Sequence, residues 1–198
     1  MAGSSQLVKE LREKTGAGFL DCQKALTENG DDIEKAVDYL RQKGLAAALK
    51  KSGRETNQGL IHSYIHMGGK IGVLIEVNCE TDFVARNEEF KSFVNDLALQ
   101  VAAGKPSYVK REDIPAELIA KERSIYEGQA KEMGKPPAAW PKIVEGKLEK
   151  FFQESCLIEQ TFVKDTAVTI KDLLALKISK IGENMNIRRF TRYQLGEA

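Results

Sequence analysis

The histidines and cysteines are the residues of this chain best suited to chemistry, and their spacing argues against a metal or catalytic site. His62 and His66 are four residues apart, a spacing that suits a metal ion on a helix. They lie in an alternating segment typical of a strand, where four residues span about 13 Å and cannot share one ion. The cysteines at positions 22, 79 and 156 are odd in number and far apart, which disfavours disulfides and cysteine metal clusters. We therefore expect buried thiols, no metal and no cofactor.

Motifs for nucleotide binding and nucleophilic catalysis are missing from the sequence. No G-x-x-x-x-G-K-[ST] pattern occurs, and the Gly68-Gly69-Lys70 step lies in a predicted hairpin turn rather than between a strand and a helix. The segment Gly59-Leu60-Ile61-His62-Ser63 does not match a nucleophile elbow. The sequence thus predicts a protein that is not an enzyme with covalent chemistry of its own.

One loop combines charge and an aromatic ring, and it spans residues 80–87 between a predicted strand and a predicted long helix. It places the carboxylate of Asp82 beside Phe83, a combination that can put an apolar wedge and a charge into a partner's pocket. Residue chemistry alone favours a plainer interpretation, in which Asp82 caps the following helix and Phe83 packs into the local core. Both interpretations are open on the residues alone.

The composition is that of a soluble protein without strong attraction to polyanions. The chain has 198 residues, a size between one large domain and two small ones. It is 42% hydrophobic and 30% charged with a net charge of +1, so it has no global field to attract nucleic acid. No apolar run approaches the roughly 20 residues that span a bilayer, and the first residues do not resemble a secretory signal. We expect a cytoplasmic protein that binds a protein or a small molecule, with no membrane and no direct nucleic-acid contact.

Three short helices are predicted over residues 4–44. The Thr15–Gly18 turn ends the first helix, and the second is predicted over Phe19–Glu28. Asp31 or Asp32 can cap the third helix, and Gly44 suits its C-terminal cap. Such a unit can bury only a small core, which suggests that it serves contact with a partner.

A partly helical, basic linker is predicted over residues 45–58, and strands follow from residue 59, where the hydrophobic period changes to 2. The predicted hairpin has Leu60–His66 and Ile71–Cys79 as arms and Gly68-Gly69 as a two-residue turn, with the odd-numbered residues of the second arm buried. A helix from Asn87 to Gly104 should pack on this hairpin.

The rest of the chain is predicted to complete an α+β fold. Residues 115–156 form a helical hairpin that resembles a coiled coil, with Val144, Leu148 and Phe151 on the stripe of its second helix. Another helix begins near Thr169, and Met185–Leu195 forms a third, antiparallel strand. The predicted organisation is a three-helix domain over residues 1–44, the linker over 45–58 and an α+β core over 59–198.

Several long motifs occur in the order found in the translation elongation factor Ts family. One group resembles its N-terminal domain, one its second signature and one its C-terminal blocks. These motifs are Leu11–Gly18, Asp21–Leu26, Gly30–Ala36 and Leu40–Gly44, then Asn78–Asn87, and then Val144–Leu148, Phe162–Asp165 and Gly182–Phe190.

This resemblance implies a ubiquitin-associated-like (UBA-like) three-helix bundle, an α+β core and guanine-nucleotide exchange on elongation factor Tu. In the family, the second signature engages the G domain of that GTPase and disturbs its magnesium site. Carried over, this role falls to Thr81, Asp82, Phe83 and Val84. The factor would bind the GDP form, dislodge Mg²⁺ and promote GDP release, so that GTP can bind again.

The resemblance also implies a second contact with the GTPase through the N-terminal domain, at Thr15, Gly16, Ala17 and Gly18. Longer family members resemble two related core subdomains, whereas this chain has one clear hairpin-helix-strand set. A three-stranded sheet with one helical cover can leave an apolar face open, which a homodimer would bury. We expect a homodimer that binds two GTPase molecules.

A competing hypothesis is an adaptor that binds RNA or a ubiquitin-like protein. Its working module would be the three-helix bundle, with Arg188, Arg189 and Arg192 as a basic strand edge. On a nearly neutral chain without an aromatic stacking motif, such arginines more often form ion pairs. Salt-sensitive RNA binding would favour this hypothesis.

Overall fold

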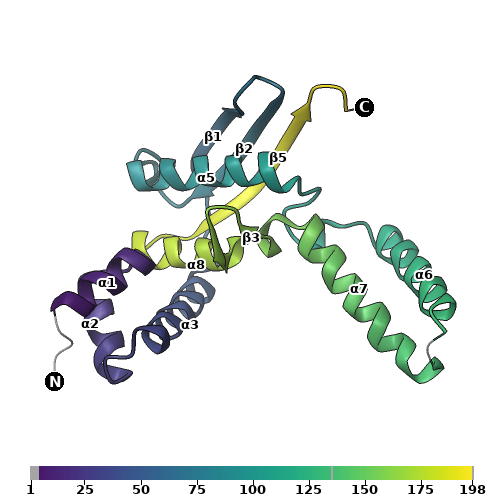
Figure 1. The fold of residues 1–198 in the computed structure, drawn as a ribbon. Helices are drawn as coiled ribbons and strands as arrows, with labels where there is room; N and C mark the ends of the chain where they lie inside the picture. The colour runs from purple at the N-terminus through teal and green to yellow at the C-terminus, as the bar shows by residue number, and fades with distance from the viewer. Residues whose placement is uncertain (1–4, 135, 198) are drawn as a thin grey trace. The chain divides into compact units, whose positions relative to one another are not determined.

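The computed structural model describes residues 5–134 and 136–197, shown as a ribbon in Figure 1. The fold class is α+β, as predicted. The chain forms two compact units, each built from separate segments. The first unit contains Met1–Leu60, Val77–Val94 and Lys171–Ile187, and the second contains Ile61–Glu76, Asn95–Ile170 and Arg188–Ala198.

The first unit begins with three helices, α1 (Ser5–Thr15), α2 (Phe19–Glu28) and α3 (Ile33–Lys51). The bounds of α2 are those predicted. Asp32 caps α3, because its side chain accepts a hydrogen bond of 3.1 Å from the Lys35 amide. The helices enclose a small apolar core formed by Val8, Leu11, Cys22, Ala25, Leu26, Ala36 and Leu40.

The predicted end of the third helix at Gly44 is wrong. The helix α3 continues to Lys51, so that residues 45–51 of the predicted linker are helical. Gly44 is buried and faces α8 (Ile170–Ile181), where a Cβ atom would lie 3.4 Å from a methyl carbon of Leu176. The alanines that follow favour a helix, and packing against α8 explains a glycine within it. The domain boundaries at residues 44 and 58 stay predictions.

Three strands form the main sheet in the order β1-β2-β5, with β1 at Gln58–Ile65, β2 at Ile71–Cys79 and β5 at Met185–Gln194. The loop between β1 and β2 covers residues 66–70 and is longer than the predicted two-residue turn. The His66 amide donates to the Ile71 carbonyl across the ends of this loop. The Leu195 amide donates to the Lys70 carbonyl, which joins the end of β5 to the start of β2. β5 is therefore antiparallel to β2, as predicted.

The buried face of β2 is the one that the alternation predicted. Its residues Val73, Ile75, Val77 and Cys79 are all buried. Helix α5 (Glu88–Gly104) ends at the predicted glycine. Its buried stripe consists of Phe90, Phe93, Val94, Leu97, Ala98, Val101 and Ala102.

The second unit contains the predicted helical hairpin, in which α6 (Ala116–Glu132) and α7 (Trp140–Ser155) lie side by side (Figure 1). Ala130, Val144 and Leu148 form its buried seam. Phe152, and not the predicted Phe151, packs against this seam. The guanidinium of Arg111 lies 4.4 Å from the centre of the Phe152 ring and adds a cation–π contact to it.

The sequence analysis did not predict the shortest elements. A two-stranded antiparallel ribbon, β3 (Thr161–Phe162) with β4 (Asp165–Thr169), follows α7. The buried side chain of Gln100 anchors it, accepting from the Val163 amide at 2.9 Å and donating to the Thr161 carbonyl at 3.2 Å. Single-turn 3₁₀ helices lie at Arg111–Asp113, Pro137–Ala139 and Leu157–Glu159. Across the described ranges, no helix is both long and apolar enough to cross a bilayer.

Candidate partner-binding site

The loop between β2 and α5, residues 80–87, contains a short helix, α4 (Asp82–Ala85). Its N-cap is Thr81, whose hydroxyl accepts from the Val84 amide at 3.4 Å. The interpretation in which Asp82 caps the long helix is therefore wrong. Asn87 caps α5 instead, because its side-chain oxygen accepts from the Glu89 amide at 2.7 Å. We refer to residues 80–87 as the β2–α5 loop.

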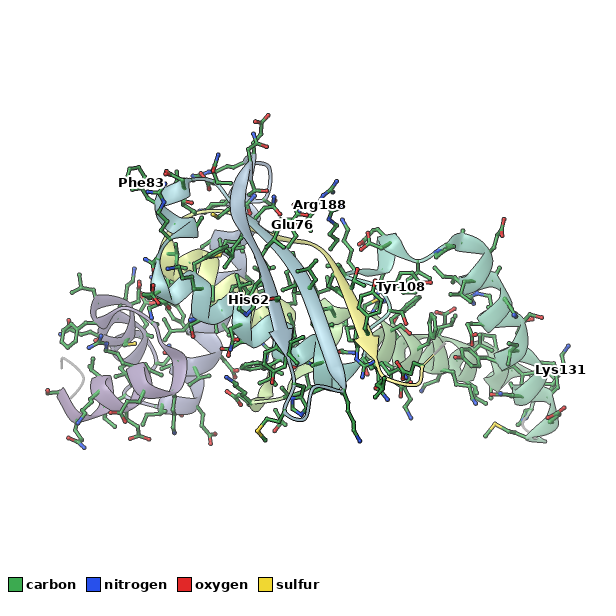
Figure 2. All side chains as sticks on the ribbon, turned by 90° about the horizontal axis from the view of Figure 1, so that it is seen from above. His62, Glu76, Phe83, Tyr108, Lys131 and Arg188 are labelled. Atoms are coloured by element: carbon green, nitrogen blue, oxygen red, sulfur yellow. The ribbon has the colours of Figure 1, made fainter. Side chains whose placement is uncertain are left out.

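Phe83 is exposed on this loop, with 81% of its surface open to solvent. In Figure 2 its side chain points away from the ribbon into solvent. The interpretation that placed Phe83 in the local core is therefore wrong. A large aromatic side chain fixed in the open on a capped helix suits contact with a partner.

The other predicted loop residues surround Phe83 with different chemistry. Asp82 forms an ion pair of 3.0 Å with Arg86, whose side chain is largely open to solvent, whereas that of Asp82 is about half exposed. Thr81 and Val84 are half-buried. The loop therefore presents one apolar ring, beside a carboxylate that is only weakly held by its neighbour.

Two carboxylates attach the β2–α5 loop to the segment before β5. Glu183 accepts three hydrogen bonds, from the Glu80 amide at 3.1 Å, from the Thr81 amide at 3.0 Å and from the Thr81 hydroxyl at 2.6 Å. In return, Glu80 accepts from the Asn184 amide at 2.5 Å. The sequence analysis assigned Glu183 no role, since it lies about a hundred residues from the loop and the motif around it gives no sign of this contact.

The thiol next to the loop is protonated and serves as a donor. The Sγ of Cys79 lies 3.2 Å from the Thr81 carbonyl, to which it donates. Burial, helped by the charge of Glu183, raises the pKa of Cys79 to about 11. Cys22 and Cys156 are also buried free thiols, as predicted, and burial raises their pKa values too. None of the three has the lowered pKa of a nucleophile.

The Thr15–Gly18 turn is fixed by local hydrogen bonds. The Thr15 hydroxyl donates to the Leu11 carbonyl at 2.7 Å and accepts from the Ala17 amide at 3.3 Å. Gly16 has a φ of 65°, in the region that glycine tolerates best. The turn borders a groove of about 220 Å³ whose other wall is α8, with Leu173, Leu176, Lys177 and Lys180 among its lining residues.

Helix α8 connects this groove to the start of α5. Lys177 and Lys180 both pair with Glu89, at 2.9 Å and 2.7 Å. Burial alone would raise the pKa of Glu89, but the hydrogen bonds from the two lysines outweigh it and lower that pKa. Glu89 lies in the first turn of α5, directly after the β2–α5 loop. The structure therefore connects the two predicted binding segments through α8, within the first unit.

The two histidines have separate partners. His62 Nε2 lies 3.3 Å from Asn95 Oδ1, and His66 Nδ1 lies 3.0 Å from the Tyr64 hydroxyl. Among the residues that the structure describes, no group of three or more histidines, cysteines and acidic residues could hold a metal ion.

Two of the three arginines in the predicted basic strand edge, Arg189 and Arg192, form ion pairs. Arg189 pairs with Glu76 at 2.7 Å, and Arg192 pairs with Glu197 at 2.9 Å. The side chain of Arg192 is only 10% exposed. An RNA-binding strip would need these guanidinium groups free for phosphates, so the structure gives the competing hypothesis little support.

Fold and site together define an α+β protein with an ordered loop that exposes an aromatic side chain. The family model "Elongation factor TS" matches residues 28–197. A protein named elongation factor Ts from Carboxydothermus hydrogenoformans is 61% identical over 98% of this chain and 89% of its own length. Those of Desulfosudis oleivorans and Moorella thermoacetica are 59% and 58% identical, over 98% and 96% of this chain and 98% and 94% of their own lengths. The chain belongs to the elongation factor Ts family, and membership implies a role in nucleotide exchange during translation elongation.

Proposed function

We propose that this chain is a guanine-nucleotide exchange factor for elongation factor Tu. It binds the GDP form of that GTPase, dislodges Mg²⁺ and promotes GDP release, so that GTP can bind again. The observation that carries this proposal is Phe83, which is 81% exposed on a capped helix beside a carboxylate. No covalent bond changes, so the factor is not an enzyme in the covalent sense.

The loop would act by displacing the part of the GTPase that holds the magnesium ligands. Magnesium bridges the nucleotide phosphates and the GTPase, so loss of the ion removes a large positive charge and weakens GDP binding. Phe83 serves as the wedge, Asp82 brings negative charge towards the displaced region, and Thr81 and Val84 hold the helix between them. Because the loop is already ordered, little binding free energy goes into folding it.

The N-terminal helices would supply a second contact. We propose that α1, α2 and α3 form a UBA-like bundle that meets the G domain through Thr15, Gly16, Ala17 and Gly18. Phe19 and Leu20 support this proposal, because both follow the turn directly and are at least half exposed. Exposed apolar side chains beside a rigid turn suit a protein interface.

The outer face of the main sheet would form a homodimer interface. Ile61 and Ile65 of β1, Leu74 of β2 and Tyr193 of β5 are all half or more exposed. Ile61 and Leu74 also line a hollow of about 300 Å³ with Phe190. A second copy would cover this apolar face, and each protomer would bind one GTPase molecule in the cytoplasm.

The test is the release of a fluorescent GDP analogue from elongation factor Tu at substoichiometric amounts of this protein. We expect acceleration by the natural chain and a loss of about 30-fold or more in Phe83→Ala, the range of a hot-spot aromatic side chain. Met67→Ala is the matched control, since Met67 is 89% exposed in the β1–β2 loop. No acceleration at any concentration would refute the function. Normal exchange by a folded Phe83→Ala protein would move the mechanism to the N-terminal turn.

A further inference from the structure

The position of Phe83 is not explained by contacts of its own side chain. The ring is 81% exposed, and the helix that carries it, α4, has four residues. A helix of this length is not stable by itself, because its nucleus costs more than its hydrogen bonds return. Contacts outside α4 must therefore hold its N-cap residue in place.

We infer that Glu183 is a positioning residue for nucleotide exchange, acting through Thr81 on Phe83. This inference rests on the proposed function of the β2–α5 loop. The Oε2 atom of Glu183 accepts from the Glu80 and Thr81 amides, and its Oε1 atom accepts from the Thr81 hydroxyl. A carboxylate that accepts hydrogen bonds with both oxygens fixes its donors more firmly than a neutral acceptor does.

Thr81 transmits this constraint to α4. Its hydroxyl donates to Glu183 at 2.6 Å and accepts from the Val84 amide at 3.4 Å, so one oxygen atom joins the carboxylate to the helix cap. Phe83 lies between the two residues that this oxygen fixes. Loss of Glu183 frees the hydroxyl and both amides, and α4 can then fray while β2 and β5 stay paired.

The hydrogen bonds of Glu80 and Asn184 explain why loss of the Glu183 carboxylate would affect the loop rather than the whole unit. Glu80 keeps its own hydrogen bond from the Asn184 amide, and the Asn184 side chain donates to the Arg54 carbonyl at 2.8 Å. Neither bond involves the Glu183 carboxylate. Loss of that carboxylate therefore affects the segment from Thr81 to Val84 first.

Three substitutions of Glu183 have different expected effects. Glu183→Gln keeps one oxygen as acceptor for the two backbone amides and places a side-chain NH₂ group beside the Thr81 hydroxyl. That hydroxyl can accept a hydrogen bond as well as donate one. Glu183→Asp is one methylene shorter and cannot keep both oxygens in place. Glu183→Ala removes the acceptors altogether. Glu117→Ala is a control for the loss of a glutamate, since Glu117 is exposed on α6.

The first readout is the maximal rate of GDP-analogue release at saturating factor. We expect Glu183→Ala to lower it about tenfold or more, because a shift of about 1 Å in a positioned group can cost up to a hundredfold. Glu183→Asp should also lose rate, Glu183→Gln should stay within about threefold of the natural chain, and Glu117→Ala should match it. The concentration for half-maximal effect should change much less, since the other contact surfaces are intact.

The second readout separates positioning from general loss of stability. In a Phe83→Ala background, Glu183→Ala should lower the rate less than about twofold, because no ring is left to position. A full tenfold loss in that background, or a normal rate for a folded Glu183→Ala protein, would overturn the inference. Equal losses for Glu183→Ala and Glu183→Gln with unchanged loop order would also overturn it.

The third readout does not depend on the GTPase. Amide hydrogen exchange at residues 80–84 should speed up in Glu183→Ala and stay slow in Glu183→Gln. Unchanged protection in Glu183→Ala would contradict the inference even if exchange activity were lost. If the natural chain failed to accelerate GDP release from the GTPase while this protection pattern held, the proposed function would fail. The positioning of the loop by Glu183 would still stand.

Discussion

At the scale of single residues, the β2–α5 loop separates the group that we propose meets the partner from the groups that hold it in place. Phe83 is open to solvent, whereas Glu183 and Thr81 are half-buried and bonded to each other. An exposed ring contributes little to the stability of the free protein. We therefore expect Phe83→Ala to leave the melting temperature nearly unchanged, in contrast to its effect on exchange.

The buried thiols give a prediction for pH. Burial raises the pKa of Cys156 to about 11, from an ordinary value of 9.0, with Glu159 adding to the effect. The folded protein keeps the thiol proton where the unfolded chain loses it. The stability that this proton contributes is therefore complete below about pH 9 and is lost as the pH rises to about 11.

The test compares urea unfolding of the natural chain and of Cys156→Ala at pH 8 and pH 10.5. The stability advantage of the natural chain over the variant should shrink at the higher pH. Because both proteins contain the same lysines, taking this difference removes the common effect of lysine titration. An advantage that grew with pH would show that the thiol is not protonated in the folded state.

Residue chemistry could not decide how the loop is built. Asp82 and Thr81 are both good N-cap residues, and only the backbone shows that Thr81 has the role. The exposure of Phe83 depends on the position of α4, and a helix of four residues leaves no periodic pattern in the sequence. Glu183 could not be assigned because β2 and β5 bring it to Thr81 from a distant part of the chain.

At the scale of elements, two glycines should respond oppositely to the same substitution. Gly59 in β1 has a φ of 152°, and a Cβ atom there would lie 2.3 Å from the Val77 carbonyl oxygen. Gly59→Ala should therefore destabilise the fold by about 2 kcal/mol or more. Gly128 lies inside α6 with no atom near its Cβ position, so Gly128→Ala should stabilise by about 0.5–1 kcal/mol. Chemical unfolding of both variants beside the natural chain tests this pair, and a destabilising Gly128→Ala would contradict it.

The elements predicted best are those with long, regular patterns. The alternation along β2 and the stripe of α5 gave both the elements and their buried faces. Prediction failed where tertiary packing overrides local signals. Gly44 looks like a helix end, yet packing against Leu176 keeps it inside α3. The β3–β4 ribbon is too short to have a pattern, and it depends on Gln100, far from it in the sequence.

At the scale of the whole molecule, the open face of the main sheet predicts the oligomeric state. Replacing Ile61 and Leu74 with lysine would place charges on the face that we propose is covered in a homodimer. We expect the natural chain to sediment near twice its 22.0 kDa mass and the Ile61→Lys, Leu74→Lys variant to sediment as a monomer with unchanged helix content. Met133→Lys, at an exposed apolar residue after α6, is the control. A natural chain that is monomeric at micromolar concentration would contradict the dimer.

The exchange proposal also fixes a relation between two affinities of the whole complex. If the factor weakens GDP binding to elongation factor Tu, GDP must weaken factor binding by the same ratio, since both follow from one coupling free energy. Each tenfold weakening corresponds to about 1.4 kcal/mol. If Phe83 acts against the occupied magnesium site as proposed, removing it should reduce this ratio more than it reduces affinity for the nucleotide-free GTPase. Titrations of the natural chain and of Phe83→Ala with nucleotide-free and GDP-bound GTPase would measure it. A factor that bound both forms equally well and still accelerated release would show that the loop lowers a kinetic barrier without displacing the magnesium site at equilibrium.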